Sequence, residues 1–248
     1  MRGTLIVCAD YESLSREAAQ RVAAALAAEA ERQSRVTVAL AGGTTPRRLY
    51  ELLASDEFRA RIPWIKIHFF WGDERLVPPD HPESNYRLAR ETLLGRVPVP
   101  PGNVHGVAGQ LPPEQAAQSY EQELRNFFRL RRGLPAFDLL LLGVGADGHT
   151  ASLFPGAPLS QLAAGEERLV MVAHGPDAMP RLTLTLPVLN AARRIYFLVA
   201  GEDKAAAVAW AVEGKGALPA QQVMTAGELL WLLDSGAASQ LKAVRVAR

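Results

Sequence analysis

The sequence predicts an α/β protein built on an open, mostly parallel, doubly wound sheet with helices on both faces. Two observations support this prediction. Short apolar runs alternate with longer amphipathic stretches along the chain. Most of the apolar runs are hydrophobic at consecutive positions, as strands covered on both faces require. Such a sheet binds ligands beyond the carboxyl ends of its strands, so functional residues are expected in the loops that follow strands.

The elements follow one another in a regular order. The first half indicates a strand at 4–9, an alanine-rich helix at 15–33, a strand at 36–40, a helix at 47–54, a strand at 65–70 and a helix at 85–94. The second half indicates a helix at 113–132, apolar runs at 137–142, 168–174 and 195–199, a helix at 203–212 and a last apolar run at 227–236. The run around Arg181 alternates with the period of a strand.

Composition and charge narrow the class of protein. The chain has 248 residues, of which 48% are hydrophobic and 21% charged, as in ordinary globular proteins. No apolar run reaches the roughly 18 to 20 residues that span a bilayer, and no signal-peptide pattern is expected at the N-terminus. The single cysteine, Cys8, cannot form an internal disulfide, which favours the cytoplasm. A net charge of +1 gives no general attraction for nucleic acid or membranes, so neither is an expected partner.

The loop AGGTTP, after the strand at 36–40, is a candidate anion site. Gly42 and Gly43 permit a tight turn beside Thr44. Thr45 is a good N-cap, and Pro46 suits the first helical position. Exposed amide groups at a helix N-terminus, together with two hydroxyls, attract a phosphate ester. For this fragment alone, a capped turn without a ligand is an equally good interpretation.

The strand at 65–70 is followed by WGDER, which brings Asp73, Glu74 and Arg75 together. A carboxylate that is partly desolvated beside a guanidinium can orient a substrate hydroxyl or act as a base. An arbitrary triplet of this kind is more often a solvated surface cluster. Its position directly after an aromatic strand favours a functional role.

The loop after the strand at 137–142 reads GVGADGHTASLFPG. Its glycines spell GxGxxG, but Pro155 and Gly156 follow too soon for the long helix that a dinucleotide-binding fingerprint opens. We interpret the glycines as a compact loop that carries Asp147 and His149 to the sheet edge. A lone histidine is often structural, but the adjacent strand end and carboxylate favour a catalytic imidazole.

Two more basic residues are candidates for binding an anion. Arg181 lies in the alternating run, and Lys204, one of four lysines, lies at the start of a helix after the strand at 195–199. A positive charge there opposes the helix dipole, and a bound anion would compensate for it. An ordinary surface lysine is the alternative. Loops that follow parallel strands meet at one sheet edge, so all these residues are expected to converge.

Five blocks occur in one order between about Leu5 and Leu233: ALAGGTTP, FFWGDERLVPPDHPESNYRLARETLL, DLLLLGVGADGHTASLFPG, PRLTLTLPVLN and VAGEDKAAAV. Together they resemble the 6-phosphogluconolactonases, whose Rossmann-like fold is shared with glucosamine-6-phosphate deaminase. The resemblance implies one domain over residues 1–248 that hydrolyses 6-phospho-D-glucono-1,5-lactone in the oxidative branch of the pentose phosphate pathway. It implies no cofactor and no metal, a small sugar-phosphate lactone as the partner, and a monomer or weak homo-oligomer.

Two other functions fit the same fold. The deaminases resemble this chain but carry a glutamate five residues beyond the histidine and an Asp-Glu-Tyr segment, where this sequence has Phe154 and Arg75. Both departures favour lactone hydrolysis. The sugar-phosphate domains of some transcription regulators are also similar and follow a DNA-binding segment. We expect no such segment here, because the first strand begins by Thr4.

The resemblance and the residues together suggest roles. His149 would be the general base, and Asp73 would orient it or a substrate hydroxyl, with Asp147 a less favoured substitute. Arg75 would stabilise the oxyanion. The phosphate would be bound by Gly42, Gly43, Thr44, Thr45, Arg181 and Lys204. Whether His149 or Asp73 is the primary base, and whether the 1,5- or the 1,4-lactone is preferred, stays open.

Overall fold

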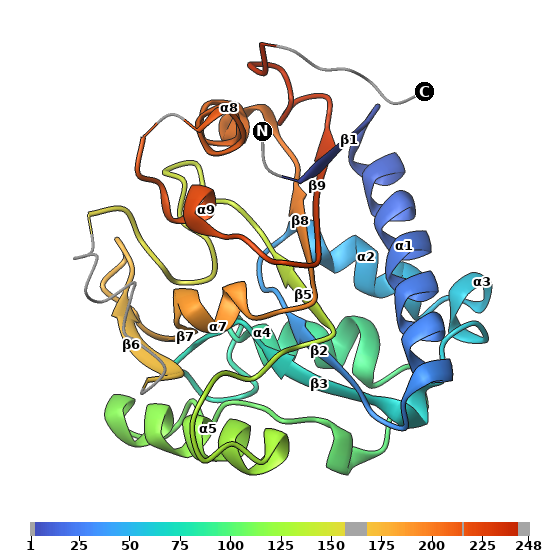
Figure 1. The fold of residues 1–248 in the computed structure, drawn as a ribbon, viewed down its shortest axis with the longest axis vertical. Helices are drawn as coiled ribbons and strands as arrows, with labels where there is room; N and C mark the ends of the chain where they lie inside the picture. Colours follow the sequence, from blue (N-terminus) through green and yellow to red (C-terminus); the bar gives the residue numbers. More distant parts are fainter. Residues whose placement is uncertain (1–2, 157–167, 215, 243–248) are drawn as a thin grey trace.

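The centre of the molecule is a parallel sheet. The computed structural model describes residues 3–156, 168–214 and 216–242. Its six-stranded sheet has the order β1-β9-β8-β5-β2-β3, and every neighbouring pair is parallel (Figure 1). The strands are β1 (Thr4–Cys8), β2 (Val36–Leu40), β3 (Ile67–Trp71), β5 (Leu139–Leu142), β8 (Arg194–Val199) and β9 (Glu228–Asp234). The open parallel sheet predicted from the sequence is therefore confirmed.

A second, smaller sheet lies beside the first and was not foreseen. It is antiparallel, with the order β4-β7-β6, and comprises β4 (Asp73–Arg75), β7 (Pro180–Leu184) and β6 (Val170–His174). The segment 73–75 was expected to be a loop, but it pairs with β7, more than 100 residues later in the chain. Three residues with charged side chains carry no strand signal of their own, so this strand depends on its partner.

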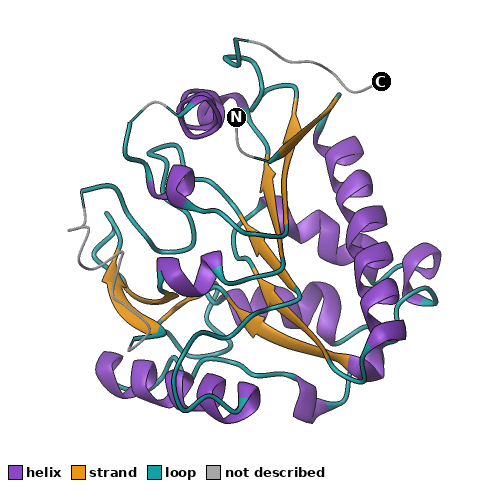
Figure 2. Ribbon diagram, viewed as in Figure 1, coloured by secondary structure: helices purple, strands orange, loops and turns teal. Residues whose placement is uncertain are grey.

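Helices cover both faces of the main sheet (Figure 2). On one side lie the helices α1 (Tyr11–Arg32), α2 (Thr45–Leu53), α3 (Asp56–Arg59) and α4 (Asn85–Ala89), the last continued by a π-helical turn over Arg90–Leu94. On the other side lie α5 (Pro113–Phe128), α7 (Leu186–Asn190), α8 (Ala205–Glu213) and α9 (Pro219–Gln222). Short 3-10 turns span Trp64–Lys66, Pro101–Asn103 and Glu202–Lys204.

Two helix boundaries differ by four residues from those predicted, 11 against 15 and 128 against 132, each for a local reason. Helix α1 begins at Tyr11 rather than at residue 15, because the Asp10 side chain caps it by accepting a hydrogen bond from the Ser13 amide. Helix α5 ends at Phe128 rather than at residue 132. Arg129 there has a φ of +55°, and this left-handed conformation stops the helix.

The core has two halves, one on each face of the main sheet. Along β2, Val38 packs into the half that includes α1 and α2, and the next residue, Ala39, packs into the half that includes α5 and α8. Strand β5 alternates in the same way, with Leu141 on the first side and Leu140 on the second. Burial on both faces explains why the strands are apolar at consecutive positions.

The strand order places a topological switch point between β2 and β5. From β2 the chain proceeds through α2 to β3 at the sheet edge, whereas from β5 it proceeds in the opposite direction to β8. The connections after β2 and β5 therefore diverge, which leaves a crevice beyond their carboxyl ends. The loops AGGTTP and GVGADGH follow these two strands.

Candidate active site

A cavity of about 320 Å3 lies at the switch point. The substitute Asp147 does not line this cavity, whereas the residues favoured by the sequence for catalysis or substrate binding do: Gly42, Gly43, Thr44, Thr45, Asp73, Arg75, His149, Arg181 and Lys204. The expected convergence of the strand-end loops is thus observed. What the structure adds is which of these side chains contact one another and which do not.

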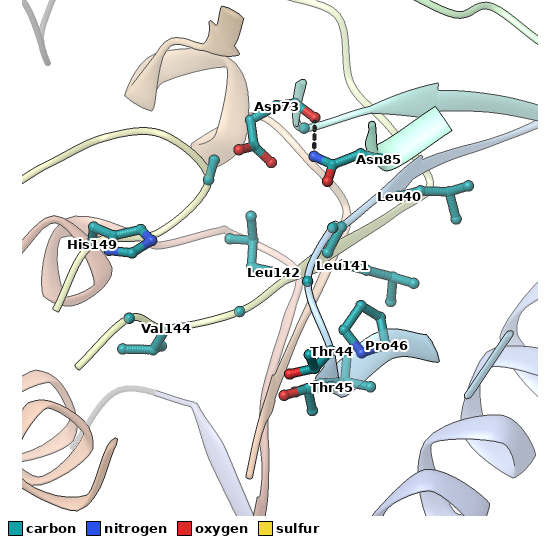
Figure 3. A pocket seen from close by; sticks show the side chains of 18 of the residues that line it. Leu40, Thr44, Thr45, Pro46, Asp73, Asn85, Leu141, Leu142, Val144 and His149 are labelled. Carbon is teal, nitrogen blue, oxygen red and sulfur yellow. Dashed lines mark hydrogen bonds between the residues drawn. The ribbon is translucent and has the colours of Figure 1, made fainter. Parts of the chain in front are cut away.

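The loop after β2 leaves a helix N-terminus open to the cavity. Gly43 has a φ of +90°, which an L side chain rarely adopts. The N-cap is Thr44 rather than Thr45, and its side chain makes no capping hydrogen bond. Figure 3 shows the hydroxyls of Thr44 and Thr45 directed toward the cavity. Pro46 has no N–H, and the amides of Arg47 and Arg48 donate to Thr44 O and to the Tyr11 hydroxyl, so Thr45 has the amide at this helix end that is available to an anion.

The histidine loop holds the His149 imidazole through a carboxylate. His149 Nδ1 lies 2.6 Å from Asp147 Oδ1, and the His149 amide donates to the same oxygen at 3.0 Å. Partial burial tends to raise the pKa of Asp147, but these hydrogen bonds outweigh it and hold the pKa below its usual range. An ionised Asp147 accepts the Nδ1 proton. The other ring nitrogen, Nε2, is then an unprotonated acceptor.

Of the two roles expected for Asp73 from the sequence, orienting His149 or a substrate hydroxyl, the structure shows no contact for the first. Asp73 Oδ2 accepts a hydrogen bond of 2.7 Å from the buried Ser152 hydroxyl, and Asp147 is the carboxylate that contacts His149. The Ser152 amide in turn donates to Thr183 Oγ1, and Thr183 is the register partner of Asp73 across β4 and β7. Figure 3 shows Asp73 and His149 approaching the cavity from different elements. Asp73 is therefore fixed independently of the imidazole.

Two guanidinium groups lie on neighbouring strands. Arg75 on β4 is the direct register partner of Arg181 on β7, and both line the cavity. Like charges placed opposite each other destabilise a sheet. The Nε atoms of both residues are buried and have no hydrogen-bond partner in the described part of the chain. An anion in the cavity would relieve the repulsion between the two charges.

Buried side chains hold the strand ends that carry these groups. The Tyr50 hydroxyl donates to Ala41 O at 2.7 Å and accepts from its amide at 3.1 Å, and Tyr120 forms the same pair of bonds with Trp71. Both tyrosines are almost fully buried. They lock the backbone where β2 and β3 end, and no local sequence signal identifies either one in this role.

Asn85 and Glu74 connect β4 to α4. Asn85 Nδ2 donates to Asp73 O at 2.9 Å, the bond drawn in Figure 3, and Asn85 Oδ1 accepts from Arg75 at 3.3 Å. A Cβ on Gly42 would lie 1.9 Å from Asn85 Oδ1, so only glycine fits there.

Burial raises the pKa of Glu74 to about 7, although the amides of Asn85, Tyr86 and Arg75 favour its ionised form. Asn85 was not predicted from the sequence. Its position directly after Ser84, the N-cap of α4, is the signal that could have identified it.

Phe154 contacts two of the predicted functional groups. Its ring centroid lies 4.8 Å from that of His149, and the Arg181 guanidinium carbon lies 5.6 Å from the Phe154 centroid. An apolar ring therefore stands beside the imidazole at the position where the deaminases were expected to carry a carboxylate.

The arrangement combines an imidazole acceptor, two arginines, a lysine and an open helix end in one cavity. Such a site can bind a phosphate ester and activate water for attack on a carbonyl. The described residues contain no group of three His, Cys, Asp or Glu side chains placed to hold a metal ion. None of the helices in the described part of the chain is both long and apolar enough to cross a membrane.

The fold and the cavity define the class of protein: an α/β enzyme with a cation-lined crevice at the carboxyl edge of a parallel sheet. The chain belongs to the family of glucosamine-6-phosphate isomerases and 6-phosphogluconolactonases, whose model matches residues 9–231. A 6-phosphogluconolactonase from Synechocystis is 49% identical over 211 residues, which make up 83% of this chain and 85% of that one.

Solved structures agree with this assignment. The 6-phosphogluconolactonase from Thermotoga maritima has a TM-score of 0.80 and 33% identity, and the match covers 93% of this chain and 99% of that one. A monomeric glucosamine-6-phosphate deaminase also matches, with a TM-score of 0.79 over 95% of this chain and 99% of that chain. Its identity is 22%, so this likeness concerns the fold alone.

Proposed function

We propose that this protein hydrolyses 6-phospho-D-glucono-1,5-lactone to 6-phospho-D-gluconate, the lactonase step in the oxidative branch of the pentose phosphate pathway. The observation that supports this most directly is the shared cavity. It brings an imidazole with a free acceptor nitrogen together with an open helix end and three cationic side chains. A phosphorylated sugar lactone needs both features, one for its phosphate and one for its ester bond.

The phosphate is bound at the open end of α2. The backbone at Gly42 and Gly43 lets the Thr45 amide at the start of α2 reach the ligand, and the hydroxyls of Thr44 and Thr45 add hydrogen bonds. Arg181 and Lys204 supply positive charge from β7 and from the start of α8. Charge-assisted hydrogen bonds of this kind are roughly twice as strong as neutral ones. They anchor the substrate by the end that does not react.

Hydrolysis proceeds by general base catalysis. His149 Nε2 takes a proton from water as the water oxygen attacks C1 of the lactone, and Asp147 stabilises the imidazolium that forms. Arg75 stabilises the oxyanion of the tetrahedral intermediate. When the intermediate collapses, the bond from C1 to the ring oxygen breaks, and His149 returns its proton to that oxygen. The product is an open chain with a carboxylate at C1.

Asp73 has a separate role in this mechanism. The Ser152 hydroxyl fixes the Asp73 carboxylate at the wall of the cavity. There the carboxylate faces the bound substrate and does not contact the imidazole. It orients a substrate hydroxyl or the attacking water.

The contact between His149 and Phe154 favours lactone hydrolysis over deamination. Ring opening of an amino sugar needs a proton-transferring group near the ring oxygen, and the expected carboxylate is replaced here by an aromatic ring 4.8 Å from the imidazole. We further propose that the chain acts as one domain in the cytoplasm, as a monomer or weak homo-oligomer.

A direct assay tests the function. The purified protein is expected to hydrolyse 6-phosphogluconolactone without added metal or nicotinamide, and to keep its activity after treatment with a chelator, because a lactone is an activated ester that an imidazole base can open. Glucosamine 6-phosphate is offered in parallel. Ammonia release from that substrate, without lactone hydrolysis, would show that the proposed function is wrong.

A further inference from the structure

Each described cation that lines the cavity is paired with a carboxylate that does not line it. Arg181 NH2 lies 2.5 Å from Asp177 Oδ2, Lys204 Nζ contacts Asp203, and Arg75 NH1 lies 3.7 Å from Glu83 Oε2. The cations are 10%, 26% and 20% exposed at their side chains, whereas the acids are 47%, 64% and 55% exposed. The positive charges therefore face the cavity and their partners face solvent.

The pair with Arg181 is the more constrained of the two at the predicted phosphate site. Asp177 lies in a tight turn in which its Oδ1 accepts from the Met179 amide at 3.1 Å. Arg181 is only 8% exposed, and its buried Nε has no partner in the described part of the chain. One carboxylate oxygen of Asp177 thus accepts the hydrogen bond that stabilises the turn, and the other accepts from the Arg181 guanidinium.

The pair with Lys204 is a contact between neighbours in sequence. Asp203 is the residue before Lys204 in the 3-10 turn that begins at Glu202. The hydrogen bond from Lys204 lowers the pKa of Asp203, so this carboxyl is ionised at neutral pH. Besides Lys204, Asp203 accepts only from its own backbone amide in the described structure, whereas Asp177 also accepts from the amide of Met179, so Asp203 is the freer of the two to turn toward solvent when an anion arrives.

We infer that, in the free protein, the carboxylates of Asp177 and Asp203 pair with the groups of Arg181 and Lys204 that bind phosphate, and that the phosphate of the ligand displaces these two carboxylates. This inference rests on the proposed function for the identity of the ligand, a sugar phosphate. A carboxylate is a weaker partner than a phosphate, which carries about 1.5 to 2 negative charges at neutral pH. The two acids therefore compete with the ligand without preventing its binding.

The competition has a consequence for turnover. The substrate and the product share the same phosphate, and hydrolysis adds a carboxylate to the product. Because Asp177 and Asp203 compete for the same cations, they lower the affinity of the site for both molecules. They also increase the rate at which the more negative product dissociates. Asp177 and Asp203 thus set the affinity of the site without touching the reacting atoms.

The test uses Asp177→Asn, Asp203→Asn and the double variant in the full chain. In Asp177→Asn the amide oxygen still accepts from Met179, while an NH2 group that cannot accept from Arg181 replaces the second carboxylate oxygen. Each single change is expected to lower KM for the phosphorylated lactone and the inhibition constant of 6-phosphogluconate roughly two- to five-fold, with no increase in kcat. KM for the non-phosphorylated gluconolactone should not change. The gain should shrink at high ionic strength, because salt screens the competing charges.

Glu57→Gln is the matched control. Glu57, whose side chain is as exposed as that of Asp177, forms an ion pair with Arg16 at 2.9 Å away from the cavity, so the variant makes the same change in net charge. The dissociation constant of inorganic phosphate, measured by calorimetry, tests the inference separately from catalysis. Phosphate binding that is no tighter in the double variant than in Glu57→Gln, or that is undetectable in both, would overturn the inference. A wild-type protein without lactonase activity would instead contradict the proposed function.

Discussion

The carboxylate that contacts the His149 imidazole is that of Asp147, only two positions earlier in the chain. Asp147 and His149 are joined by a compact turn in which the Gly145 amide donates to His149 O and the Gly148 amide donates to Gly145 O. This turn brings the Asp147 carboxylate into contact with the His149 imidazole. Asp73 was the favoured candidate from the sequence, because it follows a strand, but the Ser152 hydroxyl engages it instead.

His149 carries the first prediction at this scale. His149→Ala is expected to lose about 10²- to 10⁴-fold in kcat, the usual contribution of general acid-base catalysis, with little change in KM, because the phosphate contacts remain. Activity of the wild type should fall in acid, since a protonated imidazole cannot accept a proton from water. Asp147→Asn should lower kcat, because a neutral amide stabilises the imidazolium that forms during catalysis less than a carboxylate does.

The same measurements decide between the two candidate bases. Near-normal kcat in His149→Ala, together with loss of activity in Asp73→Asn, would identify Asp73 as the base and leave His149 a positioning residue. A kcat that is identical in wild type and Asp147→Asn would show that the 2.6 Å contact does not assist the imidazole.

At the scale of elements, the glycines of the loop after β5 have different tasks. A Cβ on Gly145 would lie 2.1 Å from His149 Nδ1 and 2.7 Å from Asp147 Oδ1, whereas a Cβ on Gly143 would meet nothing closer than Leu198 O at 4.0 Å. The first glycine of GxGxxG thus has room for a methyl group. The second is required by the contact between the imidazole and its carboxylate.

These distances predict opposite outcomes for two substitutions in one loop. Gly145→Ala should lower kcat by at least ten-fold, because the methyl group displaces the imidazole from Asp147, whereas Gly143→Ala should keep kcat within a factor of about two or three. Thermal unfolding of both variants serves as the control for folding. Equal kcat values in the two variants, with both folded, would mean that this loop does not determine the position of His149.

At the scale of the whole molecule, the sequence predicted those parts of the site that depend on local pattern and strand direction. Parallel strands end at one edge, so the loops containing Thr44 and His149 could be placed together without coordinates. The pairing of Arg75 with Arg181 could not, because it depends on a small antiparallel sheet that forms between segments more than 100 residues apart. The tyrosine that locks the end of β3, Tyr120, also comes from a distant helix.

The packing of α5 against the main sheet places a titratable ring where it links stability to pH. His68 on β3 lies half-buried, with its Nδ1 3.0 Å from His105 Nε2 and its ring 4.8 Å from that of Phe127 on α5. Burial, followed by the charges of His105 and Arg35, lowers the pKa of His68 to about 4. An unfolded histidine has a pKa of about 6.5. Between these values the unfolded chain binds the proton and the folded chain does not.

The contribution of His68 to the free energy of unfolding should therefore decrease as the pH falls from about 6.5 toward 4, and it is fully present only above that range. Glu74, whose pKa is raised to about 7, contributes with the opposite sign, so the His68 contribution is measured as the difference between wild type and variant. Because solvent screens a half-buried ring, we expect this contribution to be on the order of 1 to 2 kcal/mol, or a few degrees in Tm. His68→Asn has no imidazole to titrate and should lose correspondingly less stability between pH 7 and pH 5 in thermal unfolding. His174→Asn, at an exposed position on β6, is the control and should behave like the wild type. If His68→Asn loses as much stability in acid as the wild type does, then some other group, and not the ring between β3 and α5, causes the acid sensitivity.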